Sequence, residues 1–168
     1  MMTGVPPHPA PPRPPSERAN TFPWPPVLFA AVIAAGWVLG KLVPLPWPGT
    51  DDTAARIIGI GFGVIGVVLI AWAIVELRRA GTTVMPDQAS TALVTRGPFA
   101  RFRNPIYLGE VLLLLTTAEL TKNLWFVAAA AAFAGLVTVL QIGAEERHLE
   151  ARFGDAYRAY KAKSRRWI

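Results

Sequence analysis

The residues best suited to chemistry lie in two stretches of the chain, residues 96–110 and residues 145–160. The first is a basic segment that runs directly into an apolar one, and guanidinium groups bind carboxylates through paired hydrogen bonds. Tyr107 and Glu110 stand three residues apart, so they share one face of a predicted helix. A carboxylate that deep in an apolar helix is costly without a partner, which makes Glu110 a candidate functional residue. The arginines of this stretch are Arg96, Arg101 and Arg103.

Asn104 and Pro105 mark the start of that helix. Proline is well tolerated in the first turn, where its missing N–H would have no partner. Asparagine is a favoured N-cap because its side-chain oxygen accepts a hydrogen bond from the first turn. We therefore expect a helix that begins at Pro105 and is capped by Asn104.

The second stretch begins with two adjacent acids, Glu145 and Glu146. They could bind the hydroxyl or ammonium groups of a cofactor, or they could be interfacial charges paired with Arg147 or with the basic segment. Glu145 and His148 also form an E-x-x-H pair of the kind found in di-iron bundles. Such a site needs a second pair, and the only other histidine is His8, so we expect no metal site.

Four blocks of apolar residues, almost free of charge, must position these two stretches. A run of about 20 apolar residues spans the hydrocarbon core of a bilayer at 1.5 Å rise per residue. The sequence therefore predicts an all-α integral membrane protein with about four transmembrane helices. The third block is short and polar near its end, so we expect it to be tilted or only partly inserted. The predicted spans cover residues 27–43, 57–77, 105–120 and 124–143.

Two segments flank the spans. Residues 1–26 hold ten of the sixteen prolines and few apolar side chains, which is typical of a disordered tail. The remaining residues, 27–168, form a single membrane domain. Its last part, residues 145–163, predicts a charged helix at the cytoplasmic surface of the membrane, with one apolar stripe that faces the membrane or the central loop. The stripe consists of Leu149, Phe153, Tyr157 and Tyr160.

The formal net charge of +6 is less informative than its distribution. Lys and Arg gather in the tail, in residues 78–103 and from Arg147 onward. The positive-inside rule then places both termini and the central loop in the cytoplasm, beside the inner or plasma membrane. We expect this charge to contact anionic lipid headgroups rather than nucleic acid. The chain has no cysteine, which excludes a disulfide framework, a thiol nucleophile and a thiolate metal site.

Small residues at four-residue spacing occur in both of the first two spans, as Gly36 and Gly40 and as Gly59 and Gly63. Such pairs let helix backbones approach closely in lipid, so we expect these spans to form a tight hairpin. Residues 61–66 also match the dinucleotide-binding pattern G-x-G-x-x-G. No strand precedes them, so helix packing is the favoured interpretation.

Three segments, in this order and spacing, resemble the superfamily of isoprenylcysteine carboxyl methyltransferases and phospholipid methyltransferases, which are integral membrane enzymes. The segments are residues 93–99, 103–109 and 145–160, and the resemblance extends from about Gly81 to Trp167. It implies S-adenosyl-L-methionine as the methyl donor, bound without a Rossmann domain by the last helices and the cytoplasmic loop. It also implies a lipophilic substrate that enters from the bilayer.

The resemblance further implies roles for individual residues. Asn104 stands where the prenylcysteine enzymes commonly have histidine, so the methyl acceptor is left open among carboxylates, amines and thiols. A carboxylate needs no general base, whereas an amine must lose a proton, for which Glu110 or Glu146 could serve. The expected catalytic residues are Arg103, Glu110 and Glu146. The expected cofactor-binding residues are Gly97, Arg103, Asn104, Pro105, Tyr107, Leu108, Gly109, Glu145, Glu146, Tyr157 and Tyr160.

Two other classes of function are alternatives. A non-catalytic membrane scaffold would bind anionic lipid through the basic C-terminal helix, and its binding would weaken with salt. A reductase related to the sterol enzymes would bind a nicotinamide. The leading hypothesis is a methyltransferase that uses S-adenosyl-L-methionine and acts on a small lipophilic or membrane-borne acceptor.

Overall fold

The computed structural model describes residues 24–82 and 91–168, and within them the chain is helical apart from turns, loops and one isolated bridge. This confirms the predicted all-α fold. Most of the predicted tail, residues 1–23, lies outside the described residues. In chain order the elements are α1 (Trp24–Leu42), α2 (Thr53–Arg79), the 3-10 helix η1 (Gly97–Ala100), α3 (Pro105–Thr121), α4 (Trp125–Val137), the π-helix η2 (Thr138–Ile142) and α5 (Gly143–Lys163).

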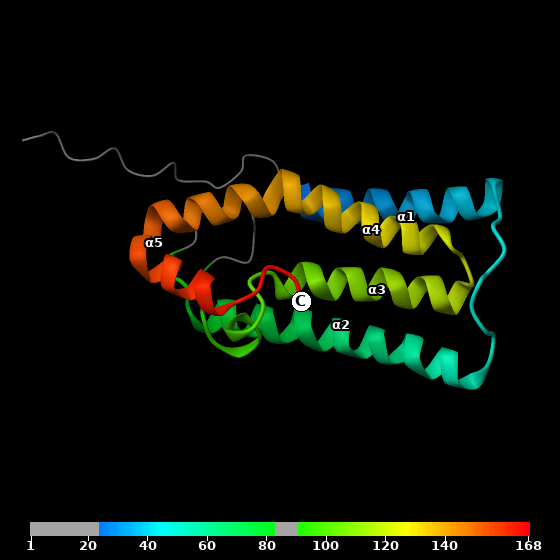
Figure 1. Cartoon of the computed structure of the whole chain (residues 1–168), viewed down its shortest axis with the longest axis horizontal. Helices are drawn as coiled ribbons and strands as arrows, with labels where there is room; N and C mark the ends of the chain where they lie inside the picture. The colour runs from blue at the N-terminus through cyan, green and yellow to red at the C-terminus, as the bar shows by residue number, and fades with distance from the viewer. Residues whose placement is uncertain (1–23, 83–90) are drawn as a thin grey trace, which may run out of the picture.

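Four helices lie side by side in the order α1, α4, α3 and α2 (Figure 1). α4 runs on through η2 into α5, and α5 then bends so that its end returns toward the start of α3 (Figure 1). We call this end of the bundle, where α2 ends and α3 begins, the α5 end. The far end holds the connection between α1 and α2, residues 43–52, and the turn between α3 and α4, residues 122–124.

α2 is packed as expected for a helix surrounded by lipid. Its buried residues are mostly small, whereas its large apolar side chains are exposed. A water-soluble helix shows the reverse, because exposed apolar area is unfavourable in water. In lipid, small residues allow close contact between helices and large apolar ones can face outward. The buried residues are Gly59, Gly63, Gly66, Ala73 and Glu76, and the exposed ones include Ile57, Ile60, Val64, Val67 and Trp72.

Three stretches of the described chain are long and apolar enough to cross a membrane: Pro25–Leu42, Thr53–Arg79 and Trp125–Lys163. α3 has 17 residues and is shorter than these, in line with the short third block of the sequence. α2 extends beyond the predicted residues 57–77 at both ends. The count of four transmembrane helices therefore stays a prediction.

The predicted hairpin of the first two spans is wrong. α1 packs against α4 and α2 packs against α3, because the α3–α4 hairpin lies between them (Figure 1). A Cβ atom built on Gly36 would lie 3.1 Å from the ring of Phe126, and one built on Gly63 would lie 3.0 Å from Thr116. The glycines do allow close contacts, but with α4 and α3. A connection of this length can cross the end of the bundle, so neighbours in sequence need not be neighbours in space.

The short turn between α3 and α4 makes the two helices an antiparallel hairpin (Figure 1). Lys122 adopts a left-handed conformation with φ 50°, which ends α3. The side-chain oxygen of Asn123 accepts a hydrogen bond from the amide of Trp125 at 3.1 Å. Its side-chain nitrogen donates to the carbonyl of Gly36 on α1 at 3.0 Å. One side chain therefore closes the turn and attaches α1 to it.

α5 contains the predicted helix 145–163, but it is not straight. Gly154 has φ 53° and ψ −125°, a conformation that is essentially restricted to glycine. The chain bends there, and residues 164–167, which we call the C-terminal segment, return to the start of α3 (Figure 1). The position of α5 on the membrane surface stays a prediction.

Gly66 and Gly109 mark a close approach between α2 and α3. A Cβ atom built on Gly66 would lie 2.8 Å from the carbonyl oxygen of Gly109, closer than real Cβ contacts. We expect Gly66→Leu to push the two helices apart and to destabilise the protein by about 1–3 kcal/mol. Thermal unfolding of the detergent-solubilised protein measures this loss.

Gly61→Leu is the matched control, because a Cβ atom on Gly61 meets nothing within 4 Å. It adds the same side chain to the same helix, in open space. An equal loss of stability in the two variants would contradict the packing of α2 on α3.

Candidate functional site

Arg103 joins the start of α3 to both parts of α5. Its side chain is largely buried, with an exposed fraction of 12%. Nε donates to Glu146 at 3.2 Å, ahead of the bend at Gly154. Nη1 donates to the carbonyl of Lys161 at 3.1 Å and to the carbonyl of Ser164, both beyond the bend. A planar guanidinium with five N–H groups can make such a set of bonds, whereas an ammonium offers three donors at a single point.

The C-terminal segment lies parallel to the residues that precede α3. The amide of Arg103 donates to the carbonyl of Arg165 at 2.7 Å. The amide of Arg165 donates to the carbonyl of Arg101 at 2.9 Å. These two bonds make a parallel bridge between Phe102 and Arg165, so backbone as well as side chains fixes the C-terminal segment.

Asn104 occupies the N-cap position, and Pro105 is the first residue of α3, as predicted. The Asn104 side chain, however, makes no capping hydrogen bond. Its nitrogen instead donates to the carbonyl of Arg166 at 2.9 Å. The predicted side-chain cap is therefore wrong, because the C-terminal segment binds this amide.

Glu146 lies between two guanidinium groups. In addition to the bond from Arg103, Arg166 donates from Nε to Oε1 at 3.0 Å and from Nη2 to Oε2 at 2.6 Å. Paired bonds of this kind are strong and directional. The hydrogen bond with Glu146 raises the pKa of Arg166 above its usual value. Glu146 therefore holds the C-terminal segment against the start of α3.

Glu145 points to a different pair of residues. The hydroxyl of Tyr107 on α3 donates to Oε1 of Glu145 at 2.9 Å. Nε2 of Gln141, which is fully buried in η2, donates to the same oxygen at 2.8 Å. The adjacent acids thus bind to different partners, and each connects α5 to the start of α3.

Two polar side chains in α3 and α5 have buried atoms with no hydrogen-bond partner among the described residues. One atom is Oε2 of Glu110, one turn beyond Tyr107 on α3. The others are both ring nitrogens of His148, one turn beyond Glu145 on α5. An unsatisfied buried polar group costs about 1–3 kcal/mol. Such a group is therefore a place where a ligand or a water molecule can complete the bonding.

Tyr157 and Tyr160 lie beyond the bend of α5, and their rings are in edge contact with centroids 6.1 Å apart. The hydroxyl of Tyr160 donates to the carbonyl of Phe99 in η1 at 2.8 Å. Tyr157 is buried, with 1% of its surface exposed. Tyr160 therefore attaches the end of α5 to the segment that leads into α3, and Tyr157 packs beside it in the interior.

The structure places two of the expected cofactor-binding glycines against α2. A Cβ atom built on Gly97 would lie 2.8 Å from the side chain of Glu76, and one on Gly109 would lie 2.7 Å from the carbonyl of Gly66. Each position requires a glycine because any larger residue would overlap α2. A role for these glycines, or for the half-buried Leu108, in cofactor binding stays a prediction.

Of the three arginines in the basic segment, only Arg103 enters this network with its side chain. Arg96 pairs with the buried Glu76 of α2 at 2.7 Å, and Arg101 is exposed. Arg96 therefore holds the loop on α2.

Sequence reasoning missed the contribution of the C-terminal segment and of Gln141. The sequence analysis assigns the basic residues after α5 to membrane topology and lipid contact, yet Arg166 binds Glu146 and Trp167 donates to the hydroxyl of Thr138 at 3.2 Å. The π-helix that carries Gln141 has no signal in the apolar pattern. The one available signal for the contact with Glu146 was a pair of arginines, Arg165 and Arg166, shortly after a helix that contains two adjacent acids.

Comparison with known proteins identifies the group to which this site belongs. Residues 54–156 match the family described as phospholipid methyltransferase. The chain belongs to the phospholipid methyltransferase family. The match covers more than half of the chain and includes both Arg103 and the paired acids.

A Haemophilus influenzae protein described as uncharacterized is 38% identical over 63 residues, which are 38% of this chain and all of that relative. No solved structure matches the chain significantly. Membership of the phospholipid methyltransferase family confirms the predicted superfamily of membrane methyltransferases. Together with the apolar helices, it marks the chain as a membrane protein.

Arg103→Ala would leave Glu146 buried with a single partly exposed partner, and would leave two carbonyls of the α5 end without a donor. We expect it to lower the free energy of unfolding by about 3 kcal/mol, because breaking a buried ion pair leaves an uncompensated charge. Arg103→Lys should recover little of this loss. Thermal unfolding in detergent measures both variants.

Arg101→Ala is the control, since the Arg101 side chain is exposed beside the same network. We expect a change within about 0.5 kcal/mol for it. Similar losses for Arg101→Ala and Arg103→Ala would contradict the central position of Arg103.

Proposed function

We propose that this protein transfers a methyl group from S-adenosyl-L-methionine to a lipophilic acceptor held in the bilayer. The observation that carries the proposal is the contact between the two motifs, through Tyr107 and Glu145 at 2.9 Å and through Arg103 and Glu146 at 3.2 Å. Membership of the phospholipid methyltransferase family supports methyl transfer as the reaction.

The residues at the α5 end fit the polar groups of S-adenosyl-L-methionine, which carries an ammonium, a carboxylate and ribose hydroxyls. The hydrogen bonds that Glu145 accepts from Tyr107 and Gln141 both fall on Oε1, so among the described residues Oε2 can accept from an ammonium or a hydroxyl. The buried oxygen of Glu110 also lacks a donor among the described residues, and we assign it to the methyl acceptor rather than to the cofactor. When bound, the cofactor would supply a methyl group on a positively charged sulfur.

The chain itself acts mainly by positioning. Tyr107 and Gln141 fix the orientation of Glu145, and Arg103 fixes Glu146 together with the end of α5. An in-line displacement gains most from reactants held in alignment, which can account for several kcal/mol of the barrier. In this scheme Arg103 and Glu146 are positioning residues, and Glu145 is the acid that contacts the cofactor.

Glu110 favours an acceptor that carries a proton or a positive charge. A carboxylate acceptor would be repelled by a second carboxylate nearby, whereas an amine gains a counter-charge and a place for its proton. We therefore assign the acceptor as a lipophilic amine, with Glu110 as the residue that receives its proton. This assignment takes one of the three acceptor classes left open by the sequence.

The distribution of basic residues gives the orientation that we propose. Arg78, Arg79, Arg101, Arg165 and Arg166 all lie at the α5 end. The positive-inside rule places this end in the cytoplasm, where the water-soluble cofactor is available and anionic headgroups are close. The acceptor would then reach the same end through the bilayer.

We expect S-adenosylhomocysteine to bind the detergent-purified protein and to raise its unfolding temperature, because a ligand that binds the folded state stabilises it. Glu145→Gln keeps the size of the side chain but removes its charge. It should weaken binding about tenfold or more, which corresponds to the loss of a charge-assisted hydrogen bond. Calorimetric titration gives the affinity.

Asp155→Asn is the matched control, since Asp155 is a fully solvated acid on the same helix, with its side chain 98% exposed. Absence of binding to the unmodified protein would refute the proposal. If the protein bound no S-adenosylhomocysteine but bound liposomes in a salt-sensitive way, it would be a membrane scaffold. If it bound a nicotinamide instead, it would be a reductase.

The acceptor class is tested with a lipid extract and methyl-labelled S-adenosyl-L-methionine. Methyl esters release the label as methanol in base, whereas methylated amines retain it. We expect base-stable label, and we expect Glu110→Gln to reduce it about 100-fold because a general base contributes this much. Binding of S-adenosylhomocysteine should change less than twofold. Base-labile product that survives Glu110→Gln would contradict the amine assignment.

A further inference from the structure

A cavity of about 330 Å³ lies at the far end of the bundle, among α2, α3, α4 and the connection between α1 and α2. We call it the far cavity. Glu119 on its wall comes twelve residues after Tyr107 on α3, so at 1.5 Å per residue the two sites are about 18 Å apart. The far cavity is therefore separate from the network around Arg103.

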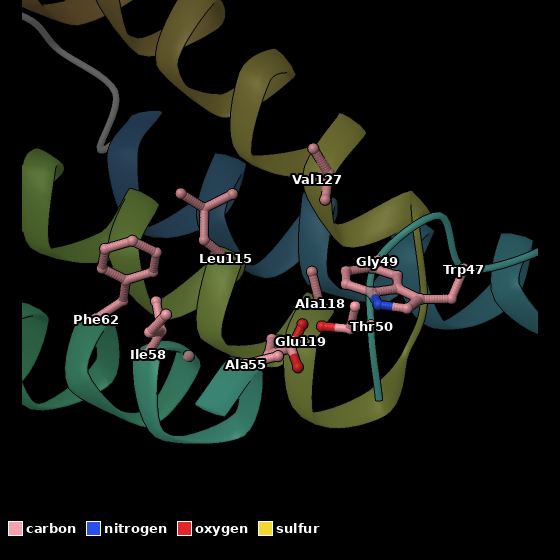
Figure 2. A pocket seen from close by; sticks show the side chains of 11 residues that line it. Trp47, Gly49, Thr50, Ala55, Ile58, Phe62, Leu115, Ala118, Glu119 and Val127 are labelled. Atoms are coloured by element: carbon pink, nitrogen blue, oxygen red, sulfur yellow. The ribbon is translucent and has the colours of Figure 1, made fainter. Parts of the chain in front are cut away.

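The far cavity has an apolar end and a polar end. Figure 2 shows Phe62 and Leu115 together at one end, and Trp47, Thr50 and Glu119 together at the other. The apolar end lies deeper in the bundle, because Leu115 precedes Glu119 by one turn of α3. A ligand that fits has a hydrocarbon part pointing inward and a polar part beside the interface.

Trp47 offers an unused donor at the polar end. Its Nε1 atom is buried and has no hydrogen-bond partner among the described residues. A buried N–H that has lost water and gained no acceptor costs about 1–3 kcal/mol. An acceptor on a bound molecule would remove this cost.

The charges that face the interior at the polar end, Lys122 and Glu119, are already paired, and the carboxylate of Asp51 is solvated, with 71% of its side chain exposed. Lys122 pairs with Glu119 and lies 3.3 Å from Asp51, and its ammonium stacks over the ring of Trp47 at 5.5 Å. The hydrogen bond with Glu119 raises the pKa of Lys122, so the ammonium remains charged. A ligand group in contact with Trp47 therefore needs no charge of its own. A neutral carbonyl suits this position better than a carboxylate or an ammonium.

The volume of the far cavity fits one hydrocarbon chain. At roughly 30 Å³ per heavy atom, the share of a water molecule in the liquid, 330 Å³ holds about 11 atoms. Half of the hydrocarbon core of a bilayer is about 15 Å thick, so a chain of this size covers most of one leaflet. Gly59 on the wall lets the side chain of Glu119 lie close to α2, because a Cβ atom there would overlap that side chain.

We propose that the far cavity binds one acyl chain of a membrane phospholipid, whose ester carbonyl accepts a hydrogen bond from Nε1 of Trp47. The apolar end holds the chain, and the neutral ester lies beside the balanced pair of Lys122 and Glu119. This inference does not depend on the proposed methyl transfer.

The test compares two phosphatidylcholines that differ only in the linkage of their chains, one with esters and one with ethers. Native mass spectrometry of the delipidated full-length protein gives the affinity for each. We expect the diester lipid to bind about three- to tenfold more tightly, the value of one net hydrogen bond. In Trp47→Phe, which lacks the donor, the two lipids should bind equally.

Two further variants locate the lipid. Leu115→Phe adds volume inside the far cavity and should weaken both lipids at least tenfold. Trp37→Phe makes the same exchange of aromatic residues on the exposed face of α1 and should leave both affinities unchanged. The proposal would be overturned if Trp47→Phe preferred the ester lipid as strongly as the unmodified protein does. It would also be overturned if a folded Leu115→Phe protein bound both lipids with undiminished affinity.

Discussion

The α5 end of this protein depends on one buried guanidinium. Arg103 requires acceptors for its N–H groups, and it finds them in Glu146 and in the carbonyls of Lys161 and Ser164. These acceptors lie on both sides of the bend at Gly154. The bend, the return of the C-terminal segment and the position of the paired acids are therefore linked, since a change in any of them would leave a charge or a carbonyl unsatisfied.

Lipid as the solvent explains the rest of the arrangement. α2 buries glycine and exposes isoleucine and valine, so the helices are joined by close backbone contacts and a few polar bonds. Ion pairs lie at the two ends of the bundle. Glu146 pairs with Arg103 and Arg166 at one end, and Lys122 pairs with Glu119 at the other. The polar groups of the two ends are therefore organised separately.

The sequence predicts the elements of this fold better than their partners. The start of α3 follows from Pro105, and the α3–α4 hairpin follows from a three-residue turn. The partners of α1 and α2 could not be predicted, because a glycine pair indicates a close contact without specifying the other helix. The role of Asn104 was also missed, since an amide can cap a helix or bind a distant carbonyl, and only the returning C-terminal segment decides between them.

The α3–α4 hairpin separates the two halves of the Arg103 network in the chain, with Arg103 on one side and Arg166 far beyond it on the other. Contacts between such distant residues close a long loop and form late in folding. Insertion of α1 and α2 into the membrane requires none of them. Biogenesis therefore has two separable stages, in which the chain first becomes a membrane protein and only afterwards acquires its paired acids in their final geometry.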